Sequence, residues 1–203
     1  MKKAFLLVVV LFVSVISTAC INNFAVQELN SKAKSYLDSG DYENAISRLK
    51  SSIDLDSTIF ETHYNLGIAY TQAEKYPEAV KTFQSAIKLR PSFADTYYSL
   101  AVAQENFARG IIEGSITSDG KSTKDEKQKN DDEDENSSPK AKIKLSDADN
   151  AKIAELFDGA INSYSTYIEK GDNVEDKSEV EEKIEKLKTE ILKYSANNTE
   201  SVQ

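Results

Sequence analysis

The chain of 203 residues has no tryptophan, one cysteine, one histidine, three prolines and seven glycines. The single Cys20 excludes an internal disulfide and any metal site built from several cysteines, and the single His63 excludes a multi-histidine site. Because β-rich folds use glycine and proline in their many turns, the scarcity of both favours helices. The net charge of −9 disfavours nucleic-acid binding, since an acidic surface repels phosphate backbones.

An uncharged run, from Ala4 to Ala19, follows Lys2 and Lys3 at the beginning of the chain. A basic start, an apolar stretch and small residues before a cleavage point are the layout of a secretory signal peptide, which we expect over residues 1–19. As a helix this run would extend about 24 Å, which is short of the roughly 30 Å of a bilayer's hydrocarbon core. A permanent membrane-spanning helix is therefore the weaker interpretation.

The apolar run ends in the letters ISTAC, with Thr18 and Ala19 directly before Cys20. This ending resembles the lipobox of bacterial lipoproteins, although Ser17 stands where that family prefers Leu. The resemblance implies cleavage before Cys20 and, over residues 20–25, a lipidated cysteine with a short tether. It implies no cofactor other than a covalent diacylglycerol and an acyl chain on Cys20.

The lipobox resemblance also implies a location. A lipidated protein would be held at the extracytoplasmic face of a bacterial cell envelope, because two or more acyl chains anchor a protein stably. Ile21 follows the cysteine, where an Asp would signal inner-membrane retention in this family, so an outer-membrane destination stays open. The alternative is an ordinary signal peptide with a cysteine nearby.

The chain repeats itself with a period of 34 residues. The segment SYLDSGDYENAISRLKSSIDL (35–55) aligns with AYTQAEKYPEAVKTFQSAIKL (69–89), and THYNLGIA (62–69) aligns with TYYSLAVA (96–103). The second copy carries His63, Leu66, Gly67, Tyr70, Ala79, Phe83 and Pro91. This copy resembles the tetratricopeptide repeat, whose pattern is W-x2-L-G-x2-Y, then A-x3-F, then P, with only the Trp replaced.

The resemblance implies an all-α fold, a short α-solenoid of about three helix hairpins, with repeats one and two and the first helix of repeat three in residues 26–112. Each hairpin buries its apolar face by stacking on its neighbours. We expect Gly67 to form, with alanines such as Ala79, a narrow seam where two helix axes approach closely. Gly40 is expected in a left-handed helix cap and Pro77 in the first turn of a helix.

The third repeat is interrupted after residue 112. Residues 113–145 carry few apolar side chains and include a run of acidic residues, so we expect a disordered acidic insertion there. Helical spacing of apolar residues returns over residues 146–171, which we expect to be the displaced second helix of repeat three. Ser146 or Asp147 can cap the start of this helix, and Gly171 its end.

A last helix is expected over residues 175–194, where Val180, Ile184 and Leu187 follow each other at helical spacing among Glu and Lys. One narrow apolar stripe predicts a C-terminal helix that caps the solenoid. The alternative is a coiled-coil dimer seam. Residues 195–203 are expected to be a disordered tail.

Catalytic residues cannot be assembled from this sequence, because His63 occupies an aromatic position of the family and Cys20 lies at the anchor. We therefore expect a protein that is not an enzyme and binds no metal. The resemblance implies instead a concave surface, formed by the first helix of each repeat, that binds a protein or peptide partner. The candidate partner-binding residues are Asn30, Lys34, Tyr64, Asn65, Ile68, Gln72, Tyr98 and Val102.

Two details of this surface stay open. Tyr64 and Tyr98 are one period apart, so we expect their rings side by side, where they either bind a partner or only pack. Some family members hold the C-terminal carboxylate of a peptide with Lys and Asn. Lys34 and Asn65 could contribute to such a site, but Asp95 stands where a basic residue would be needed.

The leading functional hypothesis is a membrane-anchored scaffold for protein–protein interaction in the cell envelope. By family analogy it would assist the assembly of envelope, pilus or secretion complexes. One alternative is a structural envelope protein that self-associates through its last helix. Another is a cation-responsive module that uses the acidic stretch NDDEDEN, although this stretch lacks the central Gly and terminal Glu of an EF-hand loop.

Overall fold

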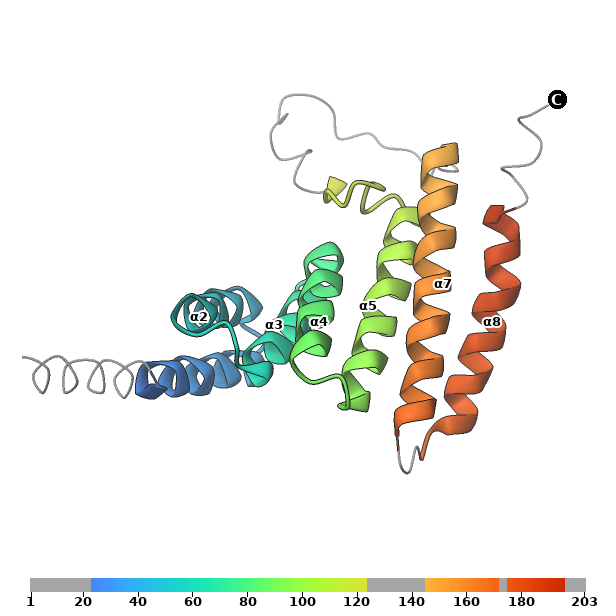
Figure 1. The fold of residues 1–203 in the computed structure, drawn as a ribbon. Helices are drawn as coiled ribbons and strands as arrows, with labels where there is room; N and C mark the ends of the chain where they lie inside the picture. Colours follow the sequence, from blue (N-terminus) through green and yellow to red (C-terminus); the bar gives the residue numbers. More distant parts are fainter. Residues whose placement is uncertain (1–22, 124–144, 172–174, 196–203) are drawn as a thin grey trace, which may run out of the picture. The chain divides into compact units, whose positions relative to one another are not determined.

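The computed structural model describes residues 23–123, 145–171 and 175–195. Within these residues all regular elements are helices, apart from an isolated bridge between Ile116 and Ser122, so the predicted all-α fold is confirmed (Figure 1). The described residues divide into two compact units, one ending at Glu74 and the other starting at Lys75. None of the described helices is long and apolar enough to span a bilayer.

Four expectations fall outside the described residues. They are the signal peptide (1–19), the lipidation of Cys20, the acidic run of the insertion (124–144) and most of the tail (196–203). The predicted seam between Gly67 and Ala79 joins residues of different units, and it also stays a prediction.

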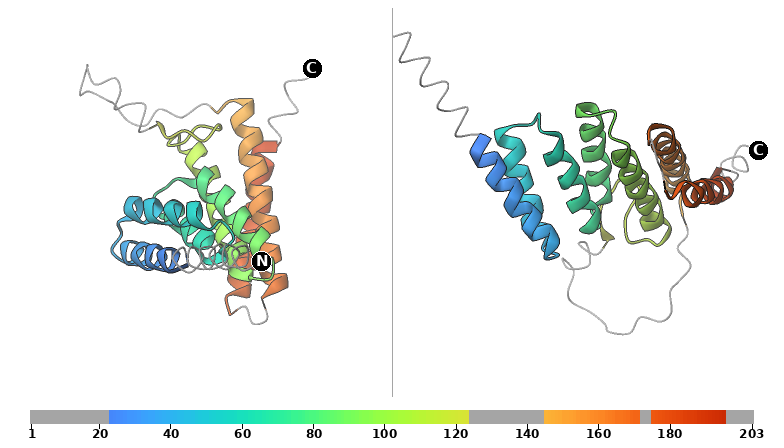
Figure 2. Two further views of the ribbon diagram at one scale, coloured as in Figure 1. Left: turned by 60° about the vertical axis from the view of Figure 1, so that its left-hand side comes forward. Right: turned by 90° about the horizontal axis from the view of Figure 1, so that it is seen from below.

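The first unit contains a helix over residues 23–38, α2 (Tyr42–Leu55) and α3 (Phe60–Gln72). The first two helices lie side by side as a hairpin (Figure 2). Gly40 ends the first helix with φ +78°, and the N–H of Asp41 donates to the carbonyl of Tyr36 at 2.9 Å. The predicted left-handed cap at Gly40 is therefore confirmed.

The core of the first unit is built largely from small and branched residues. Alanine at two positions of the hairpin lets the helix backbones approach closely, and leucines fill the remaining space. One apolar cluster of this core consists of the buried residues Ala33, Ala45, Ile46, Leu49, Leu66 and Ala69.

The second unit contains α4 (Tyr76–Leu89), α5 (Ala94–Ile112), α7 (Asp147–Lys170) and α8 (Lys177–Ser195). Each of these helices packs on the next, so that α5, α7 and α8 stand side by side (Figure 1). Pro77 lies in the first turn of α4, as predicted, where its missing N–H leaves no hydrogen bond unmade.

Helix α7 begins and ends at the residues that the sequence indicates. The Ser146 hydroxyl accepts from the N–H of Asp149 at 3.1 Å, and the Asp149 carboxylate accepts from the N–H of Ser146 at 2.9 Å, which makes a capping box. Gly171 follows the helix, with φ −79° and ψ 122°. Gly171 is therefore the C-cap residue, as predicted, with an extended backbone and its N–H donating to the carbonyl of Tyr167 at 3.0 Å.

The prediction of disorder is wrong for residues 113–123. This segment folds back as a tight turn in which the N–H of Thr117 donates to the carbonyl of Lys121 at 2.9 Å. Gly120 has φ +88° and lies so close to Pro77 that a Cβ there would be 2.8 Å from the proline ring. The side chain of Ile116 is buried against Gly110. The contacts of Gly120 with Pro77 and of Ile116 with Gly110 thus order this segment, although its average composition is polar.

Helix α8 buries its apolar stripe within the chain. Val180, Ile184 and Leu187 belong to the core of the second unit, and α8 packs on α7. The prediction of a capping helix is confirmed. The alternative of a coiled-coil seam needs the same stripe, which α7 already covers.

Candidate functional site

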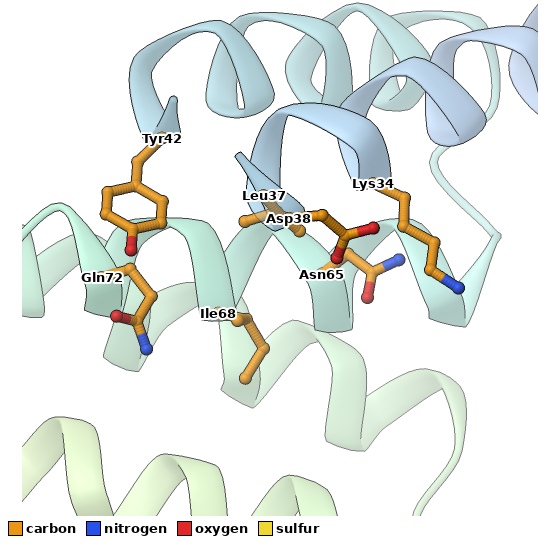
Figure 3. Close-up of a pocket in the computed structure, with 7 residues that line it drawn as sticks. All are labelled: Lys34, Leu37, Asp38, Tyr42, Asn65, Ile68 and Gln72. Atoms are coloured by element: carbon orange, nitrogen blue, oxygen red, sulfur yellow. The ribbon is translucent and has the colours of Figure 1, made fainter. Parts of the chain in front are cut away.

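A groove of about 540 Å³ lies on the first unit, between the helix of residues 23–38 and α3 (Figure 3). We call it the N-terminal groove. It is lined by Lys34, Leu37, Asp38, Tyr42, Asn65, Ile68 and Gln72. Residues three or four positions apart share one face of a helix, and this spacing brings Asn65, Ile68 and Gln72 into line along α3.

The N-terminal groove has two polar ends with apolar side chains between them. Lys34 and Asn65 lie toward one end, and Tyr42 and Gln72 toward the other (Figure 3). Leu37 and Ile68 lie between these ends and are both half-buried. An elongated ligand that lay along the groove would meet polar, apolar and polar groups in succession.

The polar side chains of the N-terminal groove share one property. Lys34, Asp38, Tyr42, Asn65 and Gln72 make no side-chain hydrogen bond or ion pair with any residue that the structure describes. Lys32, only two residues from Lys34, is by contrast paired with Glu28 at 2.6 Å. The groove therefore holds donors and acceptors that the fold itself does not use and that water covers, so a ligand can bind to them by replacing this water.

A second hollow, of about 520 Å³, lies between α7 and α8 in the second unit. Its charged side chains have partners on the same helix, since Glu185 pairs with Lys188 at 2.8 Å and Glu181 with Lys177 at 3.9 Å. The Ser165 hydroxyl donates to the carbonyl of Ile161 at 2.8 Å. This hollow offers a ligand few unsatisfied groups, so the N-terminal groove is the better candidate site.

Four of the eight residues predicted from the sequence line the N-terminal groove: Lys34, Asn65, Ile68 and Gln72. The structure adds Asp38 and Tyr42, which the sequence reasoning did not propose. Asp38 follows Lys34 by four residues, and this spacing places both on one helix face. Tyr42 pairs with Tyr76 in the repeat alignment, and so it was interpreted only as a repeat position.

Asn30 has a structural role that removes it from the candidate site. Its amide nitrogen donates to the hydroxyl of Ser52 at 3.0 Å, and its amide oxygen accepts from the hydroxyl of Thr62 at 3.1 Å. Ser52 and Thr62 are fully buried. The side chain of Asn30 therefore links three helices of the first unit and has no free amide to offer a partner.

Tyr64 lies outside the groove lining and stacks on Phe60, with ring centroids 5.8 Å apart. Tyr98, in the second unit, makes edge contacts with Tyr164 at 5.5 Å and with Tyr167 at 5.2 Å. The expected pairing of Tyr64 with Tyr98 would join the two units, and it stays a prediction.

Tyr98 and Val102 do not line the N-terminal groove, and both have contacts within the second unit. The hydroxyl of Tyr98 accepts from the ammonium group of Lys183 in α8 at 3.1 Å, and this ammonium also lies over the tyrosine ring. Val102 packs against the core of the second unit. Both side chains are therefore engaged within the chain. Tyr167, next to them, donates to Asp176 at 3.1 Å.

Groups of three or more His, Cys, Asp and Glu side chains that could hold a metal ion do not occur among the described residues. His63 has a structural contact, since its Nε2 lies 2.9 Å from the carbonyl oxygen of Ser57.

A family model described as "TPR repeat" matches residues 33–73 and 69–106. Both matched segments include residues of α3, and the first also includes the N-terminal groove from Lys34 to Gln72. Among curated proteins none matches the chain significantly.

Solved structures of similar fold exist. The first TPR of Spaghetti (RPAP3), bound to the HSP90 peptide SRMEEVD, superposes with a TM-score of 0.53 at 15% identity, covering 82% of this chain and 93% of that one. The first TPR domain of human RPAP3 gives a TM-score of 0.53 at 16% identity, covering 83% and 95%. At these identities the likeness concerns the fold alone.

Proposed function

Because the chain belongs to the tetratricopeptide-repeat (TPR) family, we propose that it is a lipid-anchored scaffold of a bacterial cell envelope that binds an extended segment of a partner protein in the N-terminal groove. Repeats of this family form surfaces for protein–protein interaction, and the finer assignment of site, anchor and location is our proposal. The observation that supports it most directly is the set of five unpartnered polar side chains in one groove.

The chemistry of the N-terminal groove suits a peptide. Asn65 and Gln72 each carry one amide donor group and one amide acceptor, which match the N–H and C=O of a peptide main chain. Leu37 and Ile68 between them can cover an apolar side chain of the ligand. Lys34 adds one positive charge and Asp38 one negative charge, so the groove can pair with a charged group of either sign on the segment. The similar RPAP3 domain also holds a peptide, which supports this class of ligand.

The anchoring half of the proposal rests on the sequence around Cys20. Thr18 and Ala19 before the only cysteine of the chain fit a lipidation signal, and the lipid would hold the first unit at a membrane surface. An outer-membrane destination is compatible with Ile21 after the cysteine. The partner would then be a protein of the same envelope, such as a component of an envelope, pilus or secretion complex.

Photo-crosslinking in the native envelope tests the groove. A photoreactive amino acid at Gln72 should capture a partner, whereas the same amino acid at Ser47, which is exposed on α2 outside the groove, should not. The double variant Lys34→Ala, Asn65→Ala should lower capture from position 72 about tenfold or more, because two hydrogen bonds to the ligand are lost.

Lys32→Ala is the matched control for the double variant, since Lys32 is an exposed lysine of the same helix that pairs with Glu28 and does not line the groove. It should leave capture unchanged. Equal capture from positions 72 and 47, or equal loss in Lys32→Ala, would show that the groove is not the binding site.

Lipid labelling tests the anchor. Cells grown with a clickable fatty acid should label the wild-type chain and should not label Cys20→Ala, which should also leave the membrane fraction. Label that persists in Cys20→Ala would refute the anchor and leave the peptide-binding proposal standing.

A further inference from the structure

Phe24 is the most exposed large hydrophobic residue of the described chain, with 70% of its surface accessible. It belongs to the first turn of the helix over residues 23–38. Val26, two residues later, is only 2% exposed and faces the core of the unit. Two residues correspond to about 200° of rotation around a helix, so Phe24 projects from the opposite side.

The side of the helix that carries Phe24 is otherwise polar. Gln27, Glu28, Ser31 and Ser35 follow at helical spacing, and all four are exposed. Gln27 donates to Asn23 at 2.8 Å, and Glu28 pairs with Lys32 at 2.6 Å. An apolar aromatic ring at the end of this polar surface does not contribute to the core of the first unit, so the fold gives no reason for it.

The position of Phe24 along the chain supplies a reason. Phe24 follows Cys20 by four positions, and a fully extended chain spans at most about 3.6 Å per residue, so the two Cα atoms are at most about 14 Å apart. An acyl-modified Cys20 must lie at the bilayer interface. The side chain of Phe24 then falls within reach of the boundary between lipid headgroups and acyl chains.

We propose that Phe24 inserts into the headgroup–acyl boundary of the membrane that carries the Cys20 lipid, and so fixes the first helix of the chain against the bilayer. This inference rests on the lipidation that the proposed function includes. The ligand class is a lipid surface. Aromatic rings are favoured at this depth of a bilayer, and an apolar side chain gains free energy when it leaves water.

This contact has a consequence for the N-terminal groove. Lys34 follows Phe24 by ten residues and Asp38 by fourteen, which correspond to about 15 Å and 21 Å along a helix. If Phe24 is held at the membrane, the groove lies no farther than about these distances from it. The partner segment must then be one that approaches the membrane surface, such as the part of a membrane-anchored protein next to its own anchor.

The chain lacks tryptophan, so a single substituted tryptophan reports on one position only. The test uses the full-length lipidated protein with Phe24→Trp, reconstituted in vesicles of phosphatidylethanolamine and phosphatidylglycerol. Its emission should shift to shorter wavelength relative to the Cys20→Ala, Phe24→Trp protein in buffer, and brominated lipids should quench it. Ser47→Trp, at an exposed position on α2 of the same unit, is the control and should show neither effect.

The two proposals fail in different ways. If mass spectrometry shows acyl chains on Cys20 but the Phe24→Trp protein emits as in water and is not quenched, the membrane contact of Phe24 is refuted and the anchor stands. If Cys20 carries no lipid, the anchor is refuted and this inference falls with it. Equal quenching of the Ser47→Trp and Phe24→Trp proteins would also refute a specific contact at Phe24.

Discussion

Thr62 and Thr96 occupy equivalent positions of successive repeats, 34 residues apart, but only one of them is hydrogen-bonded. The Thr62 hydroxyl donates to Asn30 at 3.1 Å and lies 3.4 Å from the hydroxyl of Ser52. The Thr96 hydroxyl is buried and has no hydrogen-bond partner among the described residues. The residue that corresponds to Ser52 in the second repeat is Ala86, which cannot supply one.

This difference predicts opposite effects of one substitution at the two positions. Thr62→Val should lower the free energy of unfolding by about 1–2 kcal/mol, because it leaves the half-buried amide of Asn30 with one partner fewer. Thr96→Val should leave stability unchanged or raise it by up to about 1 kcal/mol, since valine has the shape of threonine without a hydroxyl to desolvate. Urea unfolding followed by circular dichroism gives both values. Equal destabilisation by the two substitutions would contradict the hydrogen-bond assignment.

A second substitution should supply the missing partner. In Ala86→Ser the new hydroxyl would stand toward Thr96 as Ser52 stands toward Thr62, and a satisfied pair should raise stability by about 0.5–1 kcal/mol. The gain should disappear in the Thr96→Val background, and a double-mutant cycle measures this coupling. If Ala86→Ser destabilises both backgrounds equally, the site is too tightly packed for an added oxygen.

Local signals and the repeat period together were sufficient to predict the helices. Gly40 and Pro77 mark helix ends through their own backbone preferences, and these marks agree with the alignment of the repeats. Residues 113–123 could not be predicted in the same way. Their order depends on the contact of Ile116 with Gly110 and on the left-handed backbone of Gly114 and Gly120, not on mean composition.

The sequence predicted those residues of the candidate site whose orientation depends on the spacing within a single helix. Lys34, Asn65 and Ile68 face the groove because helical spacing puts them there. The role of Asn30 depends instead on Ser52 and Thr62, which lie 22 and 32 residues away in the sequence. Contacts between helices at such separations are not visible in a single helix pattern.

Gln104 stands where the repeat usually has Tyr, and it packs against a glycine of α7, Gly159. The Gln104 amide lies against the backbone of Gly159 in α7, and a Cβ at Gly159 would overlap it. Gln104 also accepts from the Ser163 hydroxyl at 3.0 Å. We expect Gly159→Ala to change stability by less than about 1 kcal/mol, because moving the Gln104 amide weakens its hydrogen bond with Ser163, while alanine favours a helix by about 1 kcal/mol over glycine.

The matched background for this prediction is Gln104→Ala, which removes the overlapping amide. There Gly159→Ala should be neutral or stabilising, because only the gain in helix propensity remains. Thermal unfolding of the two single variants and the double variant measures the coupling. If Gly159→Ala lowered stability equally in both backgrounds, the added methyl group would clash with an atom other than the Gln104 amide.

Tyr164 connects the charged residues of the second unit to its core. Its hydroxyl donates to one oxygen of Glu105 at 3.2 Å, while Arg109 donates to the other at 2.7 Å. Burial of the ring, together with the negative charge of Glu105, raises the pKa of Tyr164 well above its ordinary value. The folded chain therefore keeps this phenol protonated at a pH where the unfolded chain releases the proton.

The sign of the resulting pH dependence follows from proton linkage. Above about pH 10, the ordinary pKa of tyrosine, the unfolded state binds fewer protons than the folded state, so the free energy of unfolding falls as the pH rises. One such group contributes a fall of at most about 1.4 kcal/mol per pH unit.

Tyr164→Phe should make this fall less steep, as measured by urea unfolding at a series of pH values from about 8 to above 10. A part of the dependence should remain, because burial also raises the pKa of Tyr167 and of Tyr194. An unchanged slope in Tyr164→Phe would mean that the phenol of Tyr164 ionises as readily in the folded chain as in the unfolded one.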